Sequence, residues 1–328
     1  MTGRQEMVDR WLTPEGEELA RWALSALLDP DGELDALPLP RHDGRLDLRG
    51  IRIGGGPGSL AGVSAGGLAV EEVSELREVR ACEWKGIDFS GGVLADFRFM
   101  DSRIEDCRFT DARCKDWRAW NLRVTDTSFE GAILQDCHLG TWNEGKVTAF
   151  RRVDLSRADL KTSFFSYSQF EGCDFSGADV DGLDFRSAHF TKCRFAGDLN
   201  GTIFWFLPPR SDSVEPNPMD RVDMSACMLR FVEFRGLDLK GVSLPEGSQY
   251  IRVSCYPCVM RTAPERLRLL PGKNGKRAAA LLERQSRWIN PERDAGIWHE
   301  SDLARSEEES EMIRAVFRSC EEACGAKP

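Results

Sequence analysis

A repeat of five residues between Gly86 and Leu139 constrains the fold of this chain more than any other feature. Every fifth residue, counted from Phe89, is apolar, and the residue two places before it is small or apolar in most pentads. These pentad centres are Phe89, Leu94, Phe99, Ile104, Phe109, Cys114, Ala119, Val124, Phe129, Leu134 and Leu139. Charged residues fill the other three positions, so the pattern requires a structure in which every fifth side chain turns inward.

A period of five excludes the two common secondary structures. A helix advances about 100° per residue, so a strict period of five would spread the apolar residues around its surface. A flat strand also fails, because an odd period sends successive centres to opposite faces. The pattern is satisfied when two inward residues, spaced by two as in a strand, are followed by a corner. The chain then winds into a solenoid around an apolar core.

The segment Cys173 to Phe195, CDFSGADVDGLDFRSAHFTKCRF, resembles the consensus of the pentapeptide-repeat family. In that consensus a small residue, Asp or Asn, and then Leu or Phe precede two polar positions. The resemblance covers roughly the middle half of the chain and implies an all-β solenoid, a right-handed quadrilateral β-helix with four pentads per coil. Here the β-helix is expected to carry helical additions at both ends, and residues twenty apart are expected to stack.

Breaks in the repeat predict three parts: an N-terminal helical cap and linker (1–44), the β-helix (45–250) and a C-terminal helical module (251–328). Within the second part we expect a loop over Gly54 to Gly67. The phase of the repeat shifts near 140–149, which requires one or six inserted residues, and the pattern is lost near 205–220. A β-helix with two projecting loops loosely resembles the topoisomerase-protecting, quinolone-resistance members of the family.

Helices are predicted at both ends of the chain. Thr13 and Pro14 suit the cap and first position of a helix. Near the C-terminus the segments PERLRLL and KRAAALLERQSRWI read as two helices, and Ser306 with Glu309 forms a capping box for a third. The apolar face of that third helix is expected to pack on the open end of the solenoid or, as we favour, on a second copy in a homodimer. This face comprises Met312, Ile313, Val316, Phe317 and Cys320.

Charge adds a second expectation for the C-terminal part. Residues 261–287 are basic and residues 300–322 are acidic. Opposite charges on neighbouring helices predict that these segments pack together.

Composition limits the classes of function. The chain has 328 residues, 41% of them hydrophobic, and a net charge of −10. This acidic balance argues against direct nucleic-acid binding. The absence of a long apolar run predicts no membrane span, and the N-terminal sequence lacks a signal-peptide pattern, so we expect a cytoplasmic protein. No phosphate loop, dinucleotide fingerprint or nucleophile elbow is present, so we expect neither an enzyme nor a cofactor.

Seven of the eleven cysteines fall on repeat positions and are expected to be small buried hydrophobes in a reducing compartment. Four C-terminal cysteines could instead supply thiolates for zinc, although ordinary helix packing is the favoured interpretation and we expect no metal. These four are Cys255, Cys258, Cys320 and Cys324.

Aspartates at outward positions of the second array define the candidate binding site. A coil of twenty residues would stack Asp154 on Asp174 and Asp159 on Asp179, and stacked like charges cost stability unless they have another use. The complete predicted acidic strip is Asp154, Asp159, Asp174, Asp179 and Asp184. A merely soluble surface is the alternative interpretation of this strip.

Two functions of different kinds follow. The first is a non-catalytic protein whose acidic face imitates DNA, since some members of the resembling family occupy the DNA-binding saddle of gyrase or topoisomerase IV and protect it from inhibitors. The second is a scaffold for another protein partner, contacted through loops and through Trp142 and Trp205, since Trp is enriched at interface hot spots. A catalytic or metal-binding role of the C-terminal cysteines is the third and weakest hypothesis.

Overall fold

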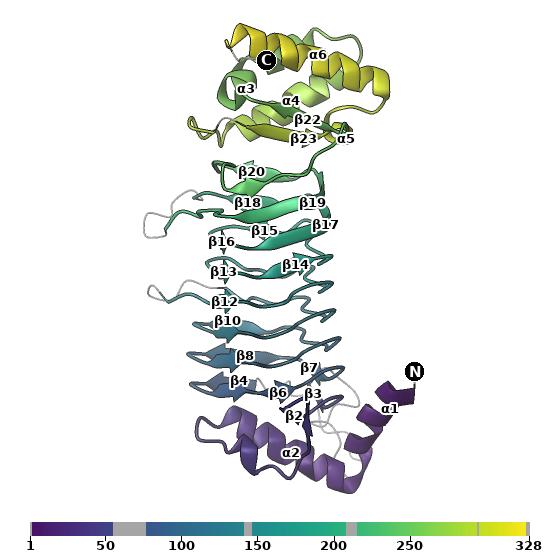
Figure 1. Ribbon diagram of the computed structural model, residues 1–328, viewed down its shortest axis with the longest axis vertical. Coiled ribbons are helices and arrows are strands. Elements are labelled where there is room, and N and C mark those ends of the chain that lie inside the picture. The colour runs from purple at the N-terminus through teal and green to yellow at the C-terminus, as the bar shows by residue number, and fades with distance from the viewer. Residues whose placement is uncertain (1, 55–76, 141–145, 208–214, 294, 326–328) are drawn as a thin grey trace, which may run out of the picture. The chain divides into compact units, whose positions relative to one another are not determined.

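The pentad centres are buried, and several of them lie in short parallel strands, in the computed structural model of this chain (Figure 1). The structure describes all residues except 1, 55–76, 141–145, 208–214, 294 and 326–328. The predicted loop after Gly54 therefore lies largely outside the described residues. The described chain divides into two compact units, residues 1–179 and residues 180–328. This division does not test the three-part organisation, which stays a prediction.

Helices precede the repeats in the first unit. They are α1 (Thr2–Asp9), the 3₁₀ helix η1 (Arg10–Leu12), α2 (Pro14–Leu28) and the 3₁₀ helix η2 (Leu34–Ala36). The predicted cap of α2 is confirmed, because Gly16 N donates to Thr13 Oγ1 at 3.0 Å. The end of α2 lies against the first coil, where Trp84 Nε1 donates to Leu27 O at 2.9 Å. Helix α1 was not foreseen.

The segment from Arg45 to Ile53 already pairs with the repeats. Strand β2 (Arg45–Asp47) runs antiparallel to β1 (Arg41–His42) and parallel to β6 (Ile87–Asp88). Strand β3 (Arg52–Ile53) runs parallel to β7 (Val93–Leu94). Both strands of this segment therefore pair in parallel with strands of the repeats.

Four parallel ladders with a register of twenty residues build the rest of the first unit. Val79 pairs with Phe99 and then Ala119, and Trp84 pairs with Ile104 and then Val124. Two further ladders, of isolated bridges, pass through Asp88 and Arg108 and through Val93 and Arg113. The remaining strands of this unit are β4 (Arg77–Arg80), β5 (Glu83–Lys85), β8 (Phe97–Met100), β9 (Arg103–Glu105), β10 (Arg118–Trp120), β11 (Arg123–Thr125), β12 (Ala149–Arg151), β13 (Gln169–Glu171) and β14 (Asp174–Ser176).

The corners between ladders explain the polar half of each pentad. The residue two places after a centre adopts a left-handed backbone, with φ of 65° at Asp96, 56° at Asp116 and 57° at Asn121. Asp, Asn and Gly tolerate this region better than other residues. The aspartates that alternate with arginines in the first array are therefore corner residues, a role that the charge pattern alone did not reveal.

The insertion near 140–149 comprises six residues. Val124 pairs with Phe150, a register of 150 − 124 = 26 instead of twenty, and Phe150 pairs with Phe170 in the ordinary register. Of the two predicted lengths, the longer is confirmed. The next coil therefore returns to the register of twenty residues.

The second unit also contains parallel strands, whose register is altered. Phe185 pairs with Phe204, 204 − 185 = 19 residues on, and Phe204 pairs with Phe234, 234 − 204 = 30 residues on. The predicted excursion near 205–220 thus adds ten residues to one coil. The parallel strands of the second unit are β15 (Asp184–Phe185), β16 (His189–Thr191), β17 (Arg194–Asn200), β18 (Ile203–Trp205), β19 (Val222–Arg230), β20 (Glu233–Arg235) and β21 (Val242–Ser243).

The C-terminal module of this unit contains a strand pair that the sequence did not predict. Strands β22 (Tyr250–Val253) and β23 (Gly296–His299) pair antiparallel. Helices α3 (Tyr256–Arg268), α4 (Asn274–Ser286), α5 (Glu300–Leu303) and α6 (Glu307–Ala323) complete the module. No helix of the described residues is long and apolar enough to cross a membrane.

The apolar face of α6 is occupied within the chain. Ile313, Phe317 and Cys320 are at most 2% exposed and belong to one core with residues of α3, α4 and the strand pair. The rings of Phe317 and Trp298 lie 5.4 Å apart. A homodimer through this face was the wrong expectation, because neighbouring elements of the same module already cover it. The capping box is confirmed, since Glu309 N donates to Ser306 Oγ at 3.2 Å.

The basic segment 261–287 and the acidic segment 300–322 do pack together, as predicted, but their charges do not pair. Helices α3 and α6 share the apolar core. Among the described residues, no recorded ion pair joins the basic segment to the acidic one. Arg268 pairs with Glu283 within the basic segment, and Arg314 pairs with Glu300 within the acidic segment. The hydrophobic effect, and not charge attraction, explains this packing.

We predict that Phe109→Ala lowers the free energy of unfolding by about 3–5 kcal/mol, because it empties a fully buried site in an aromatic stack. The Phe109 ring lies 4.9 Å from Phe89 and 4.6 Å from Phe129. Phe164→Ala is the matched control, since Phe164 is 52% exposed. Urea denaturation measures both variants; equal midpoints would contradict the assigned register.

Candidate functional site

The ladders bring the aspartates of the first unit together as predicted. Asp154 bridges Asp174, and Asp159 bridges Asp179, in parallel register. The same two ladders begin with Asp88 and Val93 and carry arginine in the next coil (Asp88–Arg108–Ser128–Asp154–Asp174 and Val93–Arg113–Ile133–Asp159–Asp179). Within these ladders, acidic residues are adjacent to one another only in the last coils of this unit.

These carboxylates are half-buried and also serve their own backbone. Asp154 Oδ1 accepts from Ser156 N at 2.9 Å, and Asp174 Oδ1 accepts from Ser176 N at 2.8 Å. Such Asx turns, in which the side chain caps the amide two residues on, explain Asp at this pentad position.

The strip is nevertheless not neutralised. Asp179 forms an ion pair with Lys161 at 2.5 Å. Asp159 accepts from the Gln135 amide at 2.6 Å and from Lys161 N at 3.2 Å, which are uncharged donors. Among the described residues, no cation lies within ion-pair distance of Asp154, Asp159 or Asp174. Three uncompensated carboxylates thus lie on two adjacent ladders.

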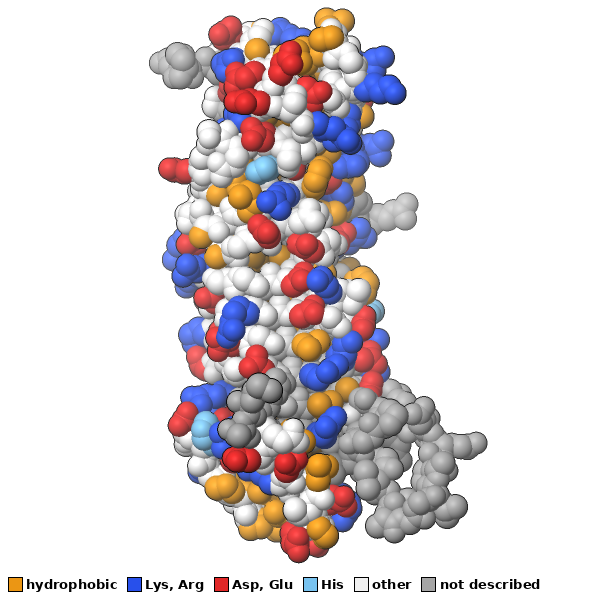
Figure 2. Space-filling model, turned by 90° about the vertical axis from the view of Figure 1, so that its right-hand side faces the viewer, with side chains coloured by type: hydrophobic (Ala, Val, Ile, Leu, Met, Phe, Trp, Pro, Cys, Tyr) orange, Lys and Arg blue, Asp and Glu red, His pale blue; other side chains and the backbone are white. Residues whose placement is uncertain are grey.

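Elsewhere the charges largely pair with one another. Arg152 pairs with Asp126, and Arg157 with Glu130, each at 2.6 Å. The face shown in Figure 2 carries acidic and basic side chains intermixed. Such exposed pairs contribute little to stability, so they describe a solvated wall and not a site.

Of the two tryptophans proposed as contacts, the structure describes Trp205 alone. Trp142 lies outside the described residues. Trp205 is 2% exposed, in the second unit, so it is not a surface contact. Its Nε1 donates to Asp184 Oδ1 at 2.7 Å, and its ring packs on Trp288 at 4.8 Å. Asp184, the fifth member of the predicted strip, is thus a partner of Trp205 and of Arg186.

Sequence reasoning missed an exposed aromatic beside the strip. Phe164 lies one ladder beyond Asp159, and its ring lies 4.6 Å from that of His138, tilted by 47°. An aromatic residue at a pentad position that mostly carries polar side chains was the signal. We count Phe164 among the candidate contacts because half of its surface is open to solvent.

The cysteines of the wall are inert packing residues, as predicted. All seven are buried, and burial raises the pKa of Cys107, Cys137 and Cys227 to about 12. Thiols of this kind are poor nucleophiles because the thiolate is the reactive form.

The four C-terminal cysteines do not form the four-thiolate site considered from the sequence. Cys258 and Cys324 form a disulfide, with their Cα atoms 6.1 Å apart. Cys255 and Cys320 are free thiols. Two of the four ligands are therefore consumed, and no cluster of potential metal ligands occurs among the described residues.

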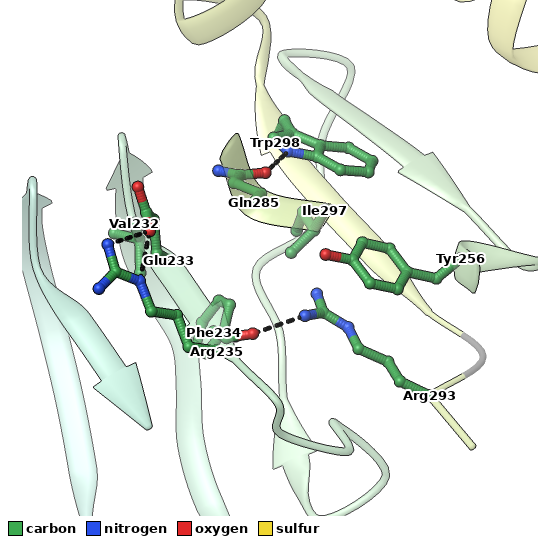
Figure 3. Close-up of a pocket in the computed structure, with 9 residues that line it drawn as sticks. All are labelled: Val232, Glu233, Phe234, Arg235, Tyr256, Gln285, Arg293, Ile297 and Trp298. Atoms are coloured by element: carbon green, nitrogen blue, oxygen red, sulfur yellow. Dashed lines mark hydrogen bonds and ion pairs between the residues drawn. The ribbon is translucent and has the colours of Figure 1, made fainter. Parts of the chain in front are cut away.

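The cavity drawn in Figure 3 is too small for a substrate. It has a volume of about 10 Å³, which is room for about one water molecule. Arg293 lies beside it, 3% exposed, with its guanidinium 4.0 Å from the Tyr256 ring centre and a hydrogen bond of 2.9 Å to Phe234 O. Burial lowers the pKa of Arg293. This buried cation ties β20 to the C-terminal module and has no evident chemistry.

A larger cleft of about 930 Å³ lies in the same module, between β23, α5 and the start of α6. Three arginines and three glutamates line it, so its charges balance. Arg314 is already bound to Glu300 and to the carbonyl oxygens of Ser248 and Tyr250. No nucleophile with its base is assembled among the described residues that line it, because His299 Nδ1 bonds Ser301 only as a local helix cap.

Asp302, near that cleft, predicts a pH dependence. Burial raises its pKa to about 6, and its Oδ1 has no hydrogen-bond partner. Between about pH 4 and pH 6 the folded protein therefore keeps a proton on Asp302. The unfolded chain, in which the pKa of this carboxyl has its ordinary value of 3.8, has released that proton. Stability therefore falls as the pH rises from about 4 to about 6 and stays lower above that range.

We predict that Asp302→Asn removes this loss. At about pH 8 the variant should unfold at a higher temperature than the wild type, because its free energy of unfolding is higher by about 1–3 kcal/mol. At about pH 4 the two proteins should unfold at the same temperature. Thermal unfolding followed across this range tests it; a wild-type advantage at the higher pH would contradict the prediction.

Comparison with known proteins agrees with the repeat architecture. Residues 168–205 match the family described as Pentapeptide repeats, in eight copies. No curated protein matches the sequence.

Similar solved structures include a pentapeptide repeat protein, Rfr23, from the cyanobacterium Cyanothece 51142 (10% identity, 40% of this chain and 92% of that one, TM-score 0.28). HetL from Nostoc sp. strain PCC 7120, titled as involved in heterocyst differentiation regulation, has 16% identity over 51% of this chain and 83% of its own, with a TM-score of 0.21. QnrB1, a plasmid-mediated fluoroquinolone resistance protein, has 18% identity over 51% and 82%, with a TM-score of 0.19. Residues 168–205 of this chain therefore carry pentapeptide repeats, and the parallel ladders with a register of twenty residues agree with that match.

Proposed function

We propose that this protein is a non-catalytic binding protein whose repeats form a right-handed quadrilateral β-helix and whose acidic ladders contact a basic surface of a protein partner. The observation that carries the proposal is the set of three carboxylates, Asp154, Asp159 and Asp174, that no described cation neutralises. Neighbouring positions of a ladder are about 4.8 Å apart. Like charges at that distance repel, so a cationic partner surface would relieve a cost that the free protein bears.

The ladder sequence supports a specialised surface. Arginines occupy the equivalent positions two and three coils earlier, at Arg108 and Arg113, so the fold itself does not demand acid there. The Asx turns would be served equally well by Asn or Ser. Negative charge at these positions is therefore available for a role other than folding.

The specific partner that we propose is DNA gyrase or topoisomerase IV. The support is the family resemblance, since some pentapeptide-repeat proteins occupy the DNA-binding saddle of these enzymes, and the charge, since a surface that binds DNA is basic. The protein would then modulate or protect the topoisomerase by standing in for DNA.

A triple variant with Asp154→Asn, Asp159→Asn and Asp174→Asn tests this function. Asn keeps the oxygen that caps each turn, so we expect the fold to persist while three charges are lost. Wild-type protein at micromolar concentration and low salt should change gyrase supercoiling or the inhibition of gyrase by a quinolone. The triple variant should need at least a tenfold higher concentration for the same effect, which corresponds to a loss of about 1.4 kcal/mol of binding free energy. Added salt should weaken the wild-type effect.

The matched control removes the same number of carboxylates elsewhere. Glu83, Glu265 and Glu322 are exposed and form no recorded ion pair, so their replacement by Gln changes the net charge equally. The control should act like the wild type. A wild-type protein without influence on gyrase or topoisomerase IV would sink the topoisomerase assignment, and equal losses in both variants would sink the acidic strip.

A scaffold for a different protein is the second candidate, and Phe164 favours it. An exposed ring next to unpaired carboxylates offers an apolar anchor with a polar rim, the usual composition of an interface hot spot. For a partner identified by affinity capture from the host, Phe164→Ser should weaken binding at least tenfold in a titration with purified components. Phe206→Ser, at a residue 39% exposed in the other unit, is the control.

A further inference from the structure

Four cysteines gather where α3 begins and α6 ends. Cys255 is the N-cap of α3, and Cys258 lies in its first turn. Cys324 is the C-cap of α6, and Cys320 lies one turn earlier. The disulfide between Cys258 and Cys324 spans these two helix ends. A disulfide bond and the free thiol of a C-x-x-C pair therefore lie in the same place.

Hydrogen bonds hold Cys255 beside this disulfide. The preceding residue, Ser254, donates from N and from Oγ to Glu321 Oε1, at 2.6 and 2.8 Å. Glu321 lies in the last turn of α6, three residues before Cys324. Cys255 O accepts from Cys258 N at 3.1 Å, which closes the first turn of α3. Cys255 is thus fixed to both sides of the bond that joins Cys258 to Cys324.

The two free thiols differ in access. Cys255 is half-buried at the edge of the module core, whereas Cys320 is fully buried within it. Thiol–disulfide exchange needs an accessible thiolate that can approach one sulfur of the bond. Cys255 meets this requirement, and Cys320 does not.

We propose that these cysteines form a thiol–disulfide exchange site in which Cys255 displaces Cys324 from Cys258. The thiolate of Cys255 attacks Sγ of Cys258, the bond between Cys258 and Cys324 breaks, and Cys324 leaves as a thiolate that takes up a proton from water. One disulfide and one thiol are present before and after, so no oxidant or reductant is consumed. Cys258 is the central sulfur because it alone is bonded in both forms.

The exchange changes how α6 is held. In the form described here, the disulfide ties the end of α6 to α3. In the exchanged form the new bond lies within the first turn of α3, and hydrogen bonds from Ser254 to Glu321 and from Arg266 to Ser319 remain at that end. The freed Cys324 thiolate can then react with the disulfide of a low-molecular-weight thiol. This inference is independent of the topoisomerase proposal, because it concerns a different surface and a different chemistry.

Trypsin separates the two bonded states. One peptide, Val253 to Arg261, contains Cys255 and Cys258, and another, Ser319 to Pro328, contains Cys320 and Cys324. Full-length oxidised protein is incubated without reductant at about pH 6 and about pH 8.5, below and near an ordinary thiol pKa. It is then quenched with acid, unfolded, alkylated and digested for mass spectrometry.

The described form gives the two peptides cross-linked, with Cys255 and Cys320 alkylated. The exchanged form gives Val253 to Arg261 with an internal disulfide and Ser319 to Pro328 alkylated twice. We expect the exchanged form to appear faster at the higher pH, because thiol–disulfide exchange proceeds through a thiolate. Cross-linked peptides alone at both pH values would overturn the proposal.

Three variants assign the sulfurs. Cys255→Ser should yield only cross-linked peptides, Cys324→Ser with oxidised glutathione should yield only the internal disulfide, and Cys320→Ser should exchange like the wild type. Persistence of the exchange in Cys255→Ser, or its loss in Cys320→Ser, would overturn the role of Cys255. Near-ultraviolet circular dichroism of Trp298, which packs on Phe317, verifies that each variant is folded.

Discussion

Parallel pairing with a register of twenty residues is the constraint on which the rest of the first unit depends. It places every fourth pentad centre directly over the last, so the rings of Phe89, Phe109 and Phe129 form one stack. It also places every outward residue in a ladder with its equivalents. Each outward side chain therefore lies one strand spacing from the outward side chains of the coils before and after it. The surface of this unit consists of columns of such side chains.

The repeat made most of this architecture predictable. A period of five admits few structures, so the buried centres, the place of an insertion of one or six residues and the pairing of Asp154 with Asp174 followed from spacing alone. The corner aspartates were interpreted from the sequence as charge partners and not as corner residues. The sequence indicates a left-handed backbone at a position such as Asp96 only through the presence of Asp, Asn or Gly there.

The failures occurred where the repeat gives no guidance. Trp205 follows a centre directly and precedes the ten-residue excursion, yet Trp288, eighty-three residues on (288 − 205), packs against it. The face of α6 was assigned to a second copy because the strand pair β22–β23, which shares its core, has no periodic pattern long enough to be recognised. The disulfide joins residues 66 apart, and spacing does not determine such a pairing. Long-range packing is the common cause of these errors.

The return of the chain to the wall after each excursion has a consequence for engineering. Six inserted residues separate Val124 from its ladder neighbour Phe150 without disturbing the pairing of the next coil, where Phe150 meets Phe170. The base of such a loop is set by hydrogen bonds of the ladder and not by the loop's own sequence. A corner of this wall is therefore a graft point, at which a foreign peptide can be displayed between two anchors of fixed separation.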